Sequence, residues 1–447
     1  MLINRRTVLT LLAGVALSLG LSTSALARQA AAQAEPSAPA AGQPILVGHF
    51  GSLTGSEATF GKSTSNGIRL AIKTFNAAGG LKGRPIELKE YDTRGDAGEA
   101  KLAVERLVKS DNVVAVLGEV ASKLSLAGAP VCQEAKVPMI SPSSTNPRVT
   151  EVGDYIFRVC FIDPFQGFAG AKFAREELKA KTAAILVDQA QAYAVGLSEQ
   201  FEQNFVKMGG TIASTQRYSG GAQDFTAQLT AIRAAKPDVI YVPGYYTDVG
   251  NIAIQARKLG LTQPLLGGDG WDSEELAKIA KDAIEGSFYT NHYAPDQPDA
   301  RVQDFIKAYR AEFGSTPDGL AALGYDAANI LFAAMRSGAS LEGPALRDAI
   351  AATKDFPGVT GNITINEKRD AVKSAVVVEM AVSDGQELPS PRYVKTVSPK
   401  YAAAGSFIVG WNITRAGRCG ASARPFRLVR RSRRTKGAAP RVGGAAA

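Results

Sequence analysis

The chain has 447 residues, of which 45% are hydrophobic and 21% are charged, a composition that excludes a fully disordered protein and leaves room for two or three globular domains. Its formal charge of +9 lies at one end, because residues 399–447 contain eleven Lys and Arg and no acid, which leaves −2 for the rest of the chain. A near-neutral body argues against a basic surface for nucleic acid or membrane outside that tail.

The first 27 residues have the pattern of a cleavable signal peptide. Arg5 and Arg6 precede an apolar run over residues 8–21. The small residues Ala25 and Ala27 fit a signal-peptidase site with cleavage after Ala27. The run is shorter than the roughly 20 apolar residues that a membrane anchor needs. The segment NRRTVLT also resembles a twin-arginine signal, so two export routes are open. Residues 28–43, rich in Ala, Gln and Pro, predict a disordered spacer, and the mature protein is expected in the periplasm.

Apolar strands and amphipathic helices then alternate along the chain in two series. A strand at 45–50 ends in a glycine-rich turn and precedes a helix whose apolar residues, from Ile68 to Phe75, recur at helical spacing. Such alternation predicts an α/β fold of two doubly wound lobes with parallel central sheets. Residues 300–352 are predicted to be mostly helical, and AVVVEMA, in the region 371–382, is predicted as one late strand. The other predicted strands are 86–92, 113–118 and 137–141 in the first series, and 183–188, 211–218, 238–244 and 264–270 in the second.

Polar residues follow the predicted strands of both series. In sheets of this kind a ligand binds outside the carboxyl ends of the strands. The first series has hydroxyl groups there, at Ser122 and in SPSSTNP (141–147), whereas the second has aromatic groups and an acid, at Tyr193, Tyr245 and Asp269. The two lobes would thus offer complementary chemistry across a cleft. The same serines and threonine also suit helix caps and turns, an alternative that the pattern leaves open.

Cysteine and histidine give little sign of a metal or a catalytic site. Cys132 and Cys160 are the only cysteines within the expected fold, and an exported protein permits a disulfide between them, with buried free thiols as the alternative. The spacings match no metal pattern, and His49 and His292 lie far apart in the sequence. The chain contains none of the common hydrolase, zinc-protease, P-loop or dinucleotide motifs. We therefore expect no cofactor, no metal and no enzymatic activity.

Seven segments, in matching order and spacing, carry a resemblance to a known family. Over about 44–398 the chain resembles the leucine/isoleucine/valine-binding family of periplasmic solute-binding proteins, which have the type I two-lobed fold. The segments are SLTGSEATFG (52–61), FNAAGGLKGRPIEL (75–88), ISPSSTNP (140–147), YIFRV (155–159), YAVG (193–196), GYYTDVG (244–250) and QARKLGL (255–261).

The resemblance implies how the chain is divided. It implies three crossings between lobes through a hinge, with 44–163 plus 292–370 in lobe I and 164–291 plus 371–398 in lobe II. The resemblance ends near residue 398, and the basic, low-complexity tail over 399–447 is interpreted as a disordered extension.

The resemblance also implies which residues contact a ligand. Ser122 and Thr145 match residues that bind a ligand carboxylate, and Ser143 matches one whose carbonyl receives the ammonium. Tyr193 and Tyr245 match aromatic groups that cover the ligand, and Asp269 matches an acid paired with the ammonium. The neighbouring Ser144 adds a further hydroxyl. Ordinary physical chemistry agrees, since helix-start amides such as those at Ser122 attract a carboxylate without a buried cation.

The implied function is transport of an amino acid. The protein would capture a branched-chain or other hydrophobic amino acid by closure of its lobes and deliver it to the permease of an ABC importer, as a monomer with no nucleic-acid partner. Three alternatives stay open: a ligand-sensing domain that controls a signalling partner, a binder of a related small carboxylate, and a nucleic-acid or anionic-lipid role for the basic tail.

Overall fold

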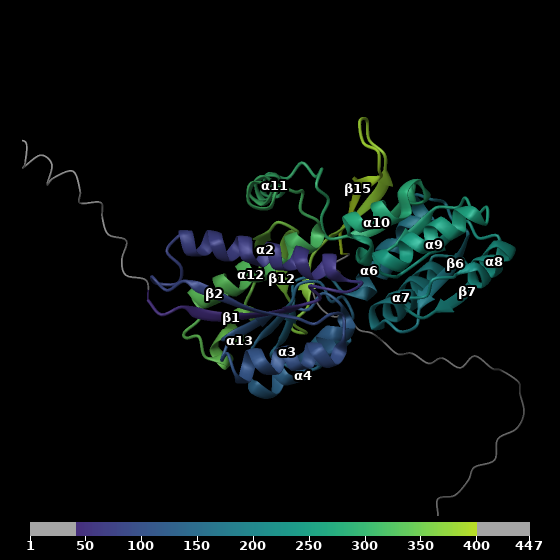
Figure 1. The fold of residues 1–447 in the computed structure, drawn as a ribbon. Helices are drawn as coiled ribbons and strands as arrows, with labels where there is room; N and C mark the ends of the chain where they lie inside the picture. The colour runs from purple at the N-terminus through teal and green to yellow at the C-terminus, as the bar shows by residue number, and fades with distance from the viewer. Residues whose placement is uncertain (1–41, 400–447) are drawn as a thin grey trace, which may run out of the picture. The chain divides into compact units, whose positions relative to one another are not determined.

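The computed structural model describes residues 42–399, and Figure 1 shows two main sheets, each with helices on both faces. The predicted signal peptide with its two possible export routes, the spacer up to residue 41 and the tail from residue 400 onward, including Cys419, lie outside the described residues. Within residues 42–399 no helix is both long and apolar enough to cross a membrane.

The first sheet is built from the first series of predicted strands. Its strand order is β2-β1-β3-β4-β5, and each neighbouring pair is parallel. Helices α2 and α12 lie on one face and α3 and α4 on the other (Figure 1). The elements are β1 (Ile45–Gly51), β2 (Ile86–Asp92), β3 (Ala115–Leu117), β4 (Met139–Ser141), β5 (Ile156–Arg158), α2 (Ala58–Ala77), α3 (Ala97–Lys109), α4 (Ser122–Ala135) and the short α5 (Arg148–Glu151).

Helices from the later part of the chain also pack around the first sheet. Helix α12 packs along α2 so closely that a Cβ atom at Gly67 would lie 2.0 Å from the Ala321 carbonyl oxygen, which explains the glycine at this position. The predicted helical region is confirmed as α11 (Ala300–Phe313), α12 (Gly319–Ser337) and α13 (Gly343–Ala351). A small antiparallel sheet follows, formed by β11 (Phe356–Gly358), β12 (Gly361–Ile365) and β13 (Ala371–Val372).

The second sheet has the order β15-β14-β10-β9-β8-β6-β7. Alternate residues of β6 enter two different cores, because Ile185 and Val187 pack with α6 and α7 whereas Ala184 and Leu186 pack with α8, α9 and α10. The strands are β6 (Thr182–Asp188), β7 (Thr211–Tyr218), β8 (Val239–Tyr241), β9 (Leu265–Gly267), β10 (Ser287–Asn291), β14 (Ala375–Ala381) and β15 (Ser390–Val397). The helices are α6 (Asp163–Glu176), α7 (Ala192–Lys207), α8 (Thr226–Ala235), α9 (Tyr246–Lys258) and α10 (Glu274–Ala280), with 3-10 turns η1 (Asp269–Trp271) and η2 (Lys281–Ile284).

Parallel pairing holds for the other strands of this sheet, and its last two strands in the sequence depart from it. β14 pairs antiparallel with β10, and β15 at the edge pairs antiparallel with β14. The connection from β14 to β15 is short, and a short connection between neighbouring strands permits only antiparallel pairing. The sequence patterns did not predict β5, β10, the three strands of the small sheet or β15 as separate strands.

The chain passes three times between the segments that supply the two sheets: after β5, after β10 and after β13. The last passage lies after residue 372, since β13 at 371–372 still pairs with β12. The predicted lobe boundaries as such stay a prediction.

The two cysteines inside the described residues are free thiols. Cys132 and Cys160 are both fully buried and form no disulfide. Burial raises the pKa of Cys160 to about 12, so this thiol stays protonated at neutral pH. Of the two alternatives that the sequence left open, the structure has the buried thiols.

Candidate ligand-binding site

A narrow cavity lies where carboxyl ends of strands from both sheets meet. Its volume is about 10 Å³, roughly the room of one water molecule, so any larger ligand requires its walls to move apart. The walls on the side of the first sheet are Phe60, Val120, Ser122, Ser143 and Leu320. The walls on the side of the second sheet are Tyr193, Tyr245, Asp269 and Gly270. Five of the seven residues predicted from the sequence thus line one cavity.

Ser122 stands at the first position of α4. The helix begins there because Ala121 has extended backbone dihedrals, and no side chain caps its first amides. The Ser122 hydroxyl oxygen accepts a hydrogen bond from the Asn146 backbone amide at 3.3 Å. An uncapped helix start next to a buried hydroxyl is a ready site for an anionic group.

The loop after β4 contributes hydroxyl groups of two kinds. The Ser143 and Thr145 hydroxyls are buried and have no hydrogen-bond partner, which costs free energy until a polar group reaches them. The Ser144 hydroxyl is instead fully engaged, at 3.0 Å from the Glu119 carbonyl, 2.9 Å from the Val120 carbonyl and 2.8 Å from Ser125 Oγ. Ser144 and Thr145 are not part of the cavity wall, and their predicted ligand contacts stay predictions.

Two tyrosines form the aromatic wall of the cavity. The rings of Tyr193 and Tyr245 stack at a centroid distance of 5.3 Å and an angle of 5°, and the Tyr193 hydroxyl accepts from the Gly270 amide at 3.1 Å. Phe60, on the first-sheet side, meets the Tyr245 ring edge-on at 5.4 Å. Burial raises the pKa of both tyrosines well above the ordinary value, so both are neutral at the cavity.

Asp269 is the acid of the cavity wall, and two buried side chains hold it. Gln166 Nε2 donates to its Oδ1 at 2.8 Å, and His292 Nε2 lies 3.0 Å from its Oδ2. Burial lowers the pKa of His292 to about 4, so the ring is neutral at neutral pH and donates its Nε2–H to the carboxylate. His292 also stacks on Phe161 with ring centroids 3.7 Å apart. The carboxylate is therefore fixed in orientation from two sides.

Neither partner of Asp269 was predicted from the sequence. His292, noted there only for its distance from His49, directly follows β10, a strand that the pattern did not reveal. Gln166 stands one turn into α6 and carried no signal as an isolated glutamine. Only the pairing of β10 with β9 places His292 beside Asp269.

Two further buried acids lie near the site. Asp163, at the start of α6, has no hydrogen-bond partner on either oxygen, and burial raises its pKa to about 8. Burial and the nearby Glu119 raise the pKa of Glu57 to about 8 as well. Both carboxyls therefore favour the protonated form near neutral pH. Neither was predicted from the sequence.

Polar contacts join the two sides around the cavity. Asn146 Nδ2 donates to the Ala192 carbonyl at 2.8 Å, and Thr247 Oγ1 donates to the Ser56 carbonyl at 2.9 Å. The Thr59 and Ser273 hydroxyls are 2.9 Å apart. These bonds tie α2 and the loop after β4 to the second-sheet elements, which is the arrangement of a cleft in its closed form.

Comparison with known proteins agrees with this architecture. The sequence model of the family described as periplasmic binding protein matches residues 44–386. A leucine-, isoleucine-, valine-, threonine-, and alanine-binding protein from Pseudomonas aeruginosa is 31% identical over 332 residues, which cover 74% of this chain and 88% of the relative.

Two solved structures are similar over nearly their whole length. The leucine binding protein LivK from Thermotoga maritima has a TM-score of 0.75 and 38% identity, over 79% of this chain and 99% of the other. The branched-chain amino acid transporter substrate binding protein LivJ from Streptococcus pneumoniae, in complex with isoleucine, has a TM-score of 0.73 and 32% identity, over 78% and 99%. The fold is therefore that of the type I periplasmic binding proteins, and the chain belongs to the leucine/isoleucine/valine-binding branch of the periplasmic binding protein family.

Proposed function

We propose that this protein binds a branched-chain or other hydrophobic amino acid outside the cytoplasm and delivers it to the permease of an ABC importer. One observation carries the proposal: buried hydroxyls of the first-sheet side, one of them without any partner, share a small cavity with a buried carboxylate of the second-sheet side. A zwitterion is neutral overall and satisfies both sides at once. The names of the relatives support the same ligand class.

The ligand carboxylate would bind on the first-sheet side. The start of α4 at Ser122 offers amides and the positive end of a helix dipole, and the Ser143 hydroxyl offers a free donor. Within the cavity wall no Lys or Arg is present, so neutral donors have to hold the anion.

The ammonium group would bind at Asp269. The carboxylate is buried, and its orientation is set by Gln166 and His292, so it needs no rearrangement to accept a charged donor. Since His292 is neutral near pH 7, it leaves the negative charge of Asp269 for the ligand.

The ligand side chain would meet apolar groups. Phe60, Val120, Leu320 and the Tyr245 ring line the rest of the cavity, which favours an aliphatic side chain over a polar one. A larger side chain requires a wider cavity, and separation of the two lobes about the crossings supplies it. The closed form is then selected by contacts that exist only when both sides touch the ligand.

A thermal-shift and calorimetric screen of the full chain tests the proposal. Leucine, isoleucine and valine should raise the unfolding temperature, whereas 4-methylpentanoate, which lacks the amine, and isopentylamine, which lacks the carboxylate, should not. An equal shift with 4-methylpentanoate would favour a binder of small carboxylates, and no shift with any amino acid would contradict the proposal.

The family places the protein outside the cytoplasm. Cleavage after Ala27, the export route and a monomeric state remain predictions.

A transport experiment separates a transport role from control of a signalling partner. The protein is coexpressed with a permease encoded by a neighbouring gene, and uptake of labelled leucine is measured. Only a transport role requires the permease.

A further inference from the structure

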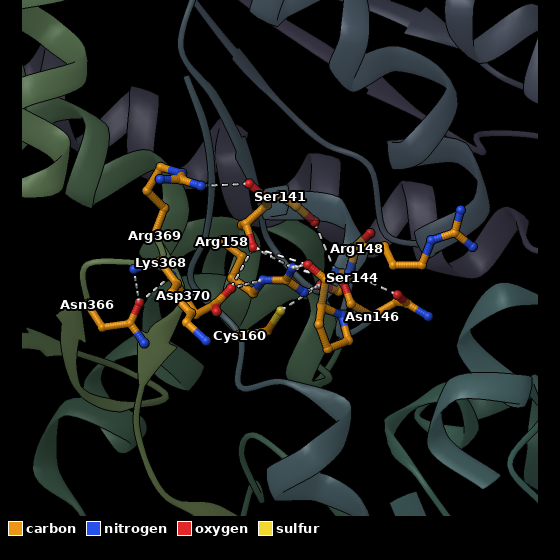
Figure 2. Close-up of polar contacts among 12 residues, drawn as sticks. Ser141, Ser144, Asn146, Arg148, Arg158, Cys160, Asn366, Lys368, Arg369 and Asp370 are labelled. Carbon is orange, nitrogen blue, oxygen red and sulfur yellow. Dashed lines mark hydrogen bonds and ion pairs between the residues drawn. The ribbon is translucent and has the colours of Figure 1, made fainter. Parts of the chain in front are cut away.

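Arg158 is a charged side chain buried behind the loop that supplies the cavity hydroxyls. It ends β5, and its exposed fraction is 0%. Figure 2 shows its guanidinium between Asp370 and the chain around Ser144 and Asn146. We propose that Arg158 is a positioning residue of the ligand site, which holds the loop over 142–147 so that its hydroxyls and the Thr145 amide face the ligand carboxylate. This inference rests on the proposed function for the identity of the ligand.

The guanidinium binds the loop at successive carbonyl groups. Arg158 Nη1 donates to the Ser144 carbonyl, and Nη2 donates to the Asn146 carbonyl at 2.9 Å and to the Pro147 carbonyl at 3.2 Å. Nη2 also donates to Thr150 Oγ1 at 3.0 Å, just after the loop. One planar group therefore fixes three peptide units of the short loop over 142–147.

Fixing the Ser144 carbonyl also fixes the Thr145 amide that follows it. In a trans peptide the C=O and N–H bonds point in opposite directions, so the Thr145 amide faces away from Arg158 while the Ser144 carbonyl faces toward it. Cys160 Sγ donates to the same Ser144 carbonyl at 3.3 Å. The Ser144 hydroxyl is held separately by the Glu119 and Val120 carbonyls. The backbone on both sides of Ser144 is thereby locked, with the unpartnered Ser143 and Thr145 hydroxyls on either side of it.

Asp370 anchors the guanidinium from the opposite direction. Arg158 Nε lies 2.7 Å from Asp370 Oδ1, and the same oxygen accepts from Thr150 Oγ1 at 2.8 Å. Asp370 directly precedes β13, which leads into the third crossing between the sheets. The loop is thus tied to a segment 220 residues away in the sequence, next to the hinge about which the lobes would close.

The chemistry of arginine fits positioning better than stabilisation alone. A buried ion pair contributes little net stability, because desolvation offsets most of the attraction. A guanidinium, in contrast, presents several donors in one rigid plane, which lysine cannot imitate. Replacing it with lysine keeps the charge beside Asp370 but removes most of the bonds to the loop.

The first test compares Arg158→Lys with Arg257→Lys in the full chain. Arg257 is the matched control, because its guanidinium also binds three carbonyls, those of Ala283, Leu261 and Gln263, away from the cavity. Arg158→Lys should weaken binding of L-leucine about tenfold or more in calorimetry, a difference of roughly 1.4 kcal/mol. Arg257→Lys should lower the unfolding temperature and leave affinity unchanged. Equal affinity of folded Arg158→Lys and wild type would overturn the inference.

A double-mutant cycle shows whether Arg158 acts through the loop. In a Ser143→Ala, Thr145→Val background, Arg158→Lys should cost much less affinity than in the wild-type background, while its effect on the unfolding temperature persists. The same fold-loss in both backgrounds contradicts an action through these hydroxyls. If Arg158→Lys does not fold, Thr150→Val replaces it as the milder variant, with an expected loss of a few fold.

Hydrogen exchange separates this inference from the proposed function. In protein without ligand, Arg158→Lys should speed amide exchange within residues 142–147, and Arg257→Lys should not. Should the wild-type protein bind no amino acid, the proposed function fails and the exchange result still decides the role of Arg158. Unchanged exchange over 142–147 counts against that role whatever the ligand is.

Discussion

The two sides of the cavity differ in where their charged side chains lie. The first-sheet side has only neutral donors in the wall, the Ser122 and Ser143 hydroxyls and a helix start, and its charged pair of Arg158 and Asp370 lies behind the wall. The second-sheet side places a charge in the wall itself, at Asp269, with neutral groups behind it. The ligand carboxylate would be held by hydroxyls and the positive end of a helix dipole, whereas the ammonium would be held by a carboxylate, whose full charge makes the stronger hydrogen bond.

The largest expected effect is on the pH dependence of folding stability, and it comes from Asp163, the buried acid at the start of α6. Burial raises the pKa of Asp163 from 3.8 to about 8, so the unfolded chain loses this proton before the folded protein does. The contribution of Asp163 to stability is present in full below pH 4 and falls as pH rises toward 8. Between pH 5 and pH 8 this amounts to up to about 4 kcal/mol.

Asp163→Asn should therefore flatten the decline of stability over that range, measured by urea unfolding at pH 5 and pH 8. Asp238→Asn serves as the control, because this carboxylate is exposed and hydrogen bonds from Thr182 and Lys181 lower its pKa, so it does not titrate between pH 5 and pH 8. A decline as steep in Asp163→Asn as in wild type would assign the pH dependence to another group such as Glu57.

The next largest effect is on leucine affinity, and it comes from removing the negative charge of the second-sheet side. Asp269→Asn should weaken leucine binding by about 3 kcal/mol, because the ammonium would be buried without its charged partner. Calorimetry at pH 7 measures this, and circular dichroism checks that the protein is folded. If Asp269→Asn and wild type bind leucine equally, the ammonium is held elsewhere and the contrast between the two sides disappears.

A smaller effect is expected from two serines of the loop after β4, one of which should act on affinity and the other on stability. Ser143→Ala should lower affinity for leucine by about 1 kcal/mol with little loss of stability, because the hydroxyl has no partner in the protein. Ser144→Ala should do the reverse, with about 1 kcal/mol or more of stability lost, because its hydroxyl bridges the Glu119 and Val120 carbonyls. Affinity and urea unfolding of both variants test the pair, and a reversed outcome would exchange the roles of the two serines.

Most wall residues could be predicted from the sequence because they directly follow strands. Ser122, Ser143, Tyr193, Tyr245 and Asp269 each stand within a few residues of a strand end, and the carboxyl ends of parallel strands meet at one edge of a sheet. The residues behind the wall could not be predicted in this way. Gln166 and His292 bind Asp269 from 103 and 23 residues away, and Arg158 pairs with Asp370 far along the chain. No local pattern marks such pairs.

The sequence by itself determined the alternation of strands and helices, and hence the α/β class, because periodic burial is a local property of a segment. It also determined the kinds of group that reach the cavity. The tertiary structure decided which two of three neighbouring hydroxyls are free, which histidine supports the acid, and why a buried arginine is tolerated at residue 158. These depend on hydrogen-bond partners that folding brings together from distant segments, and a buried polar group takes its role from those partners.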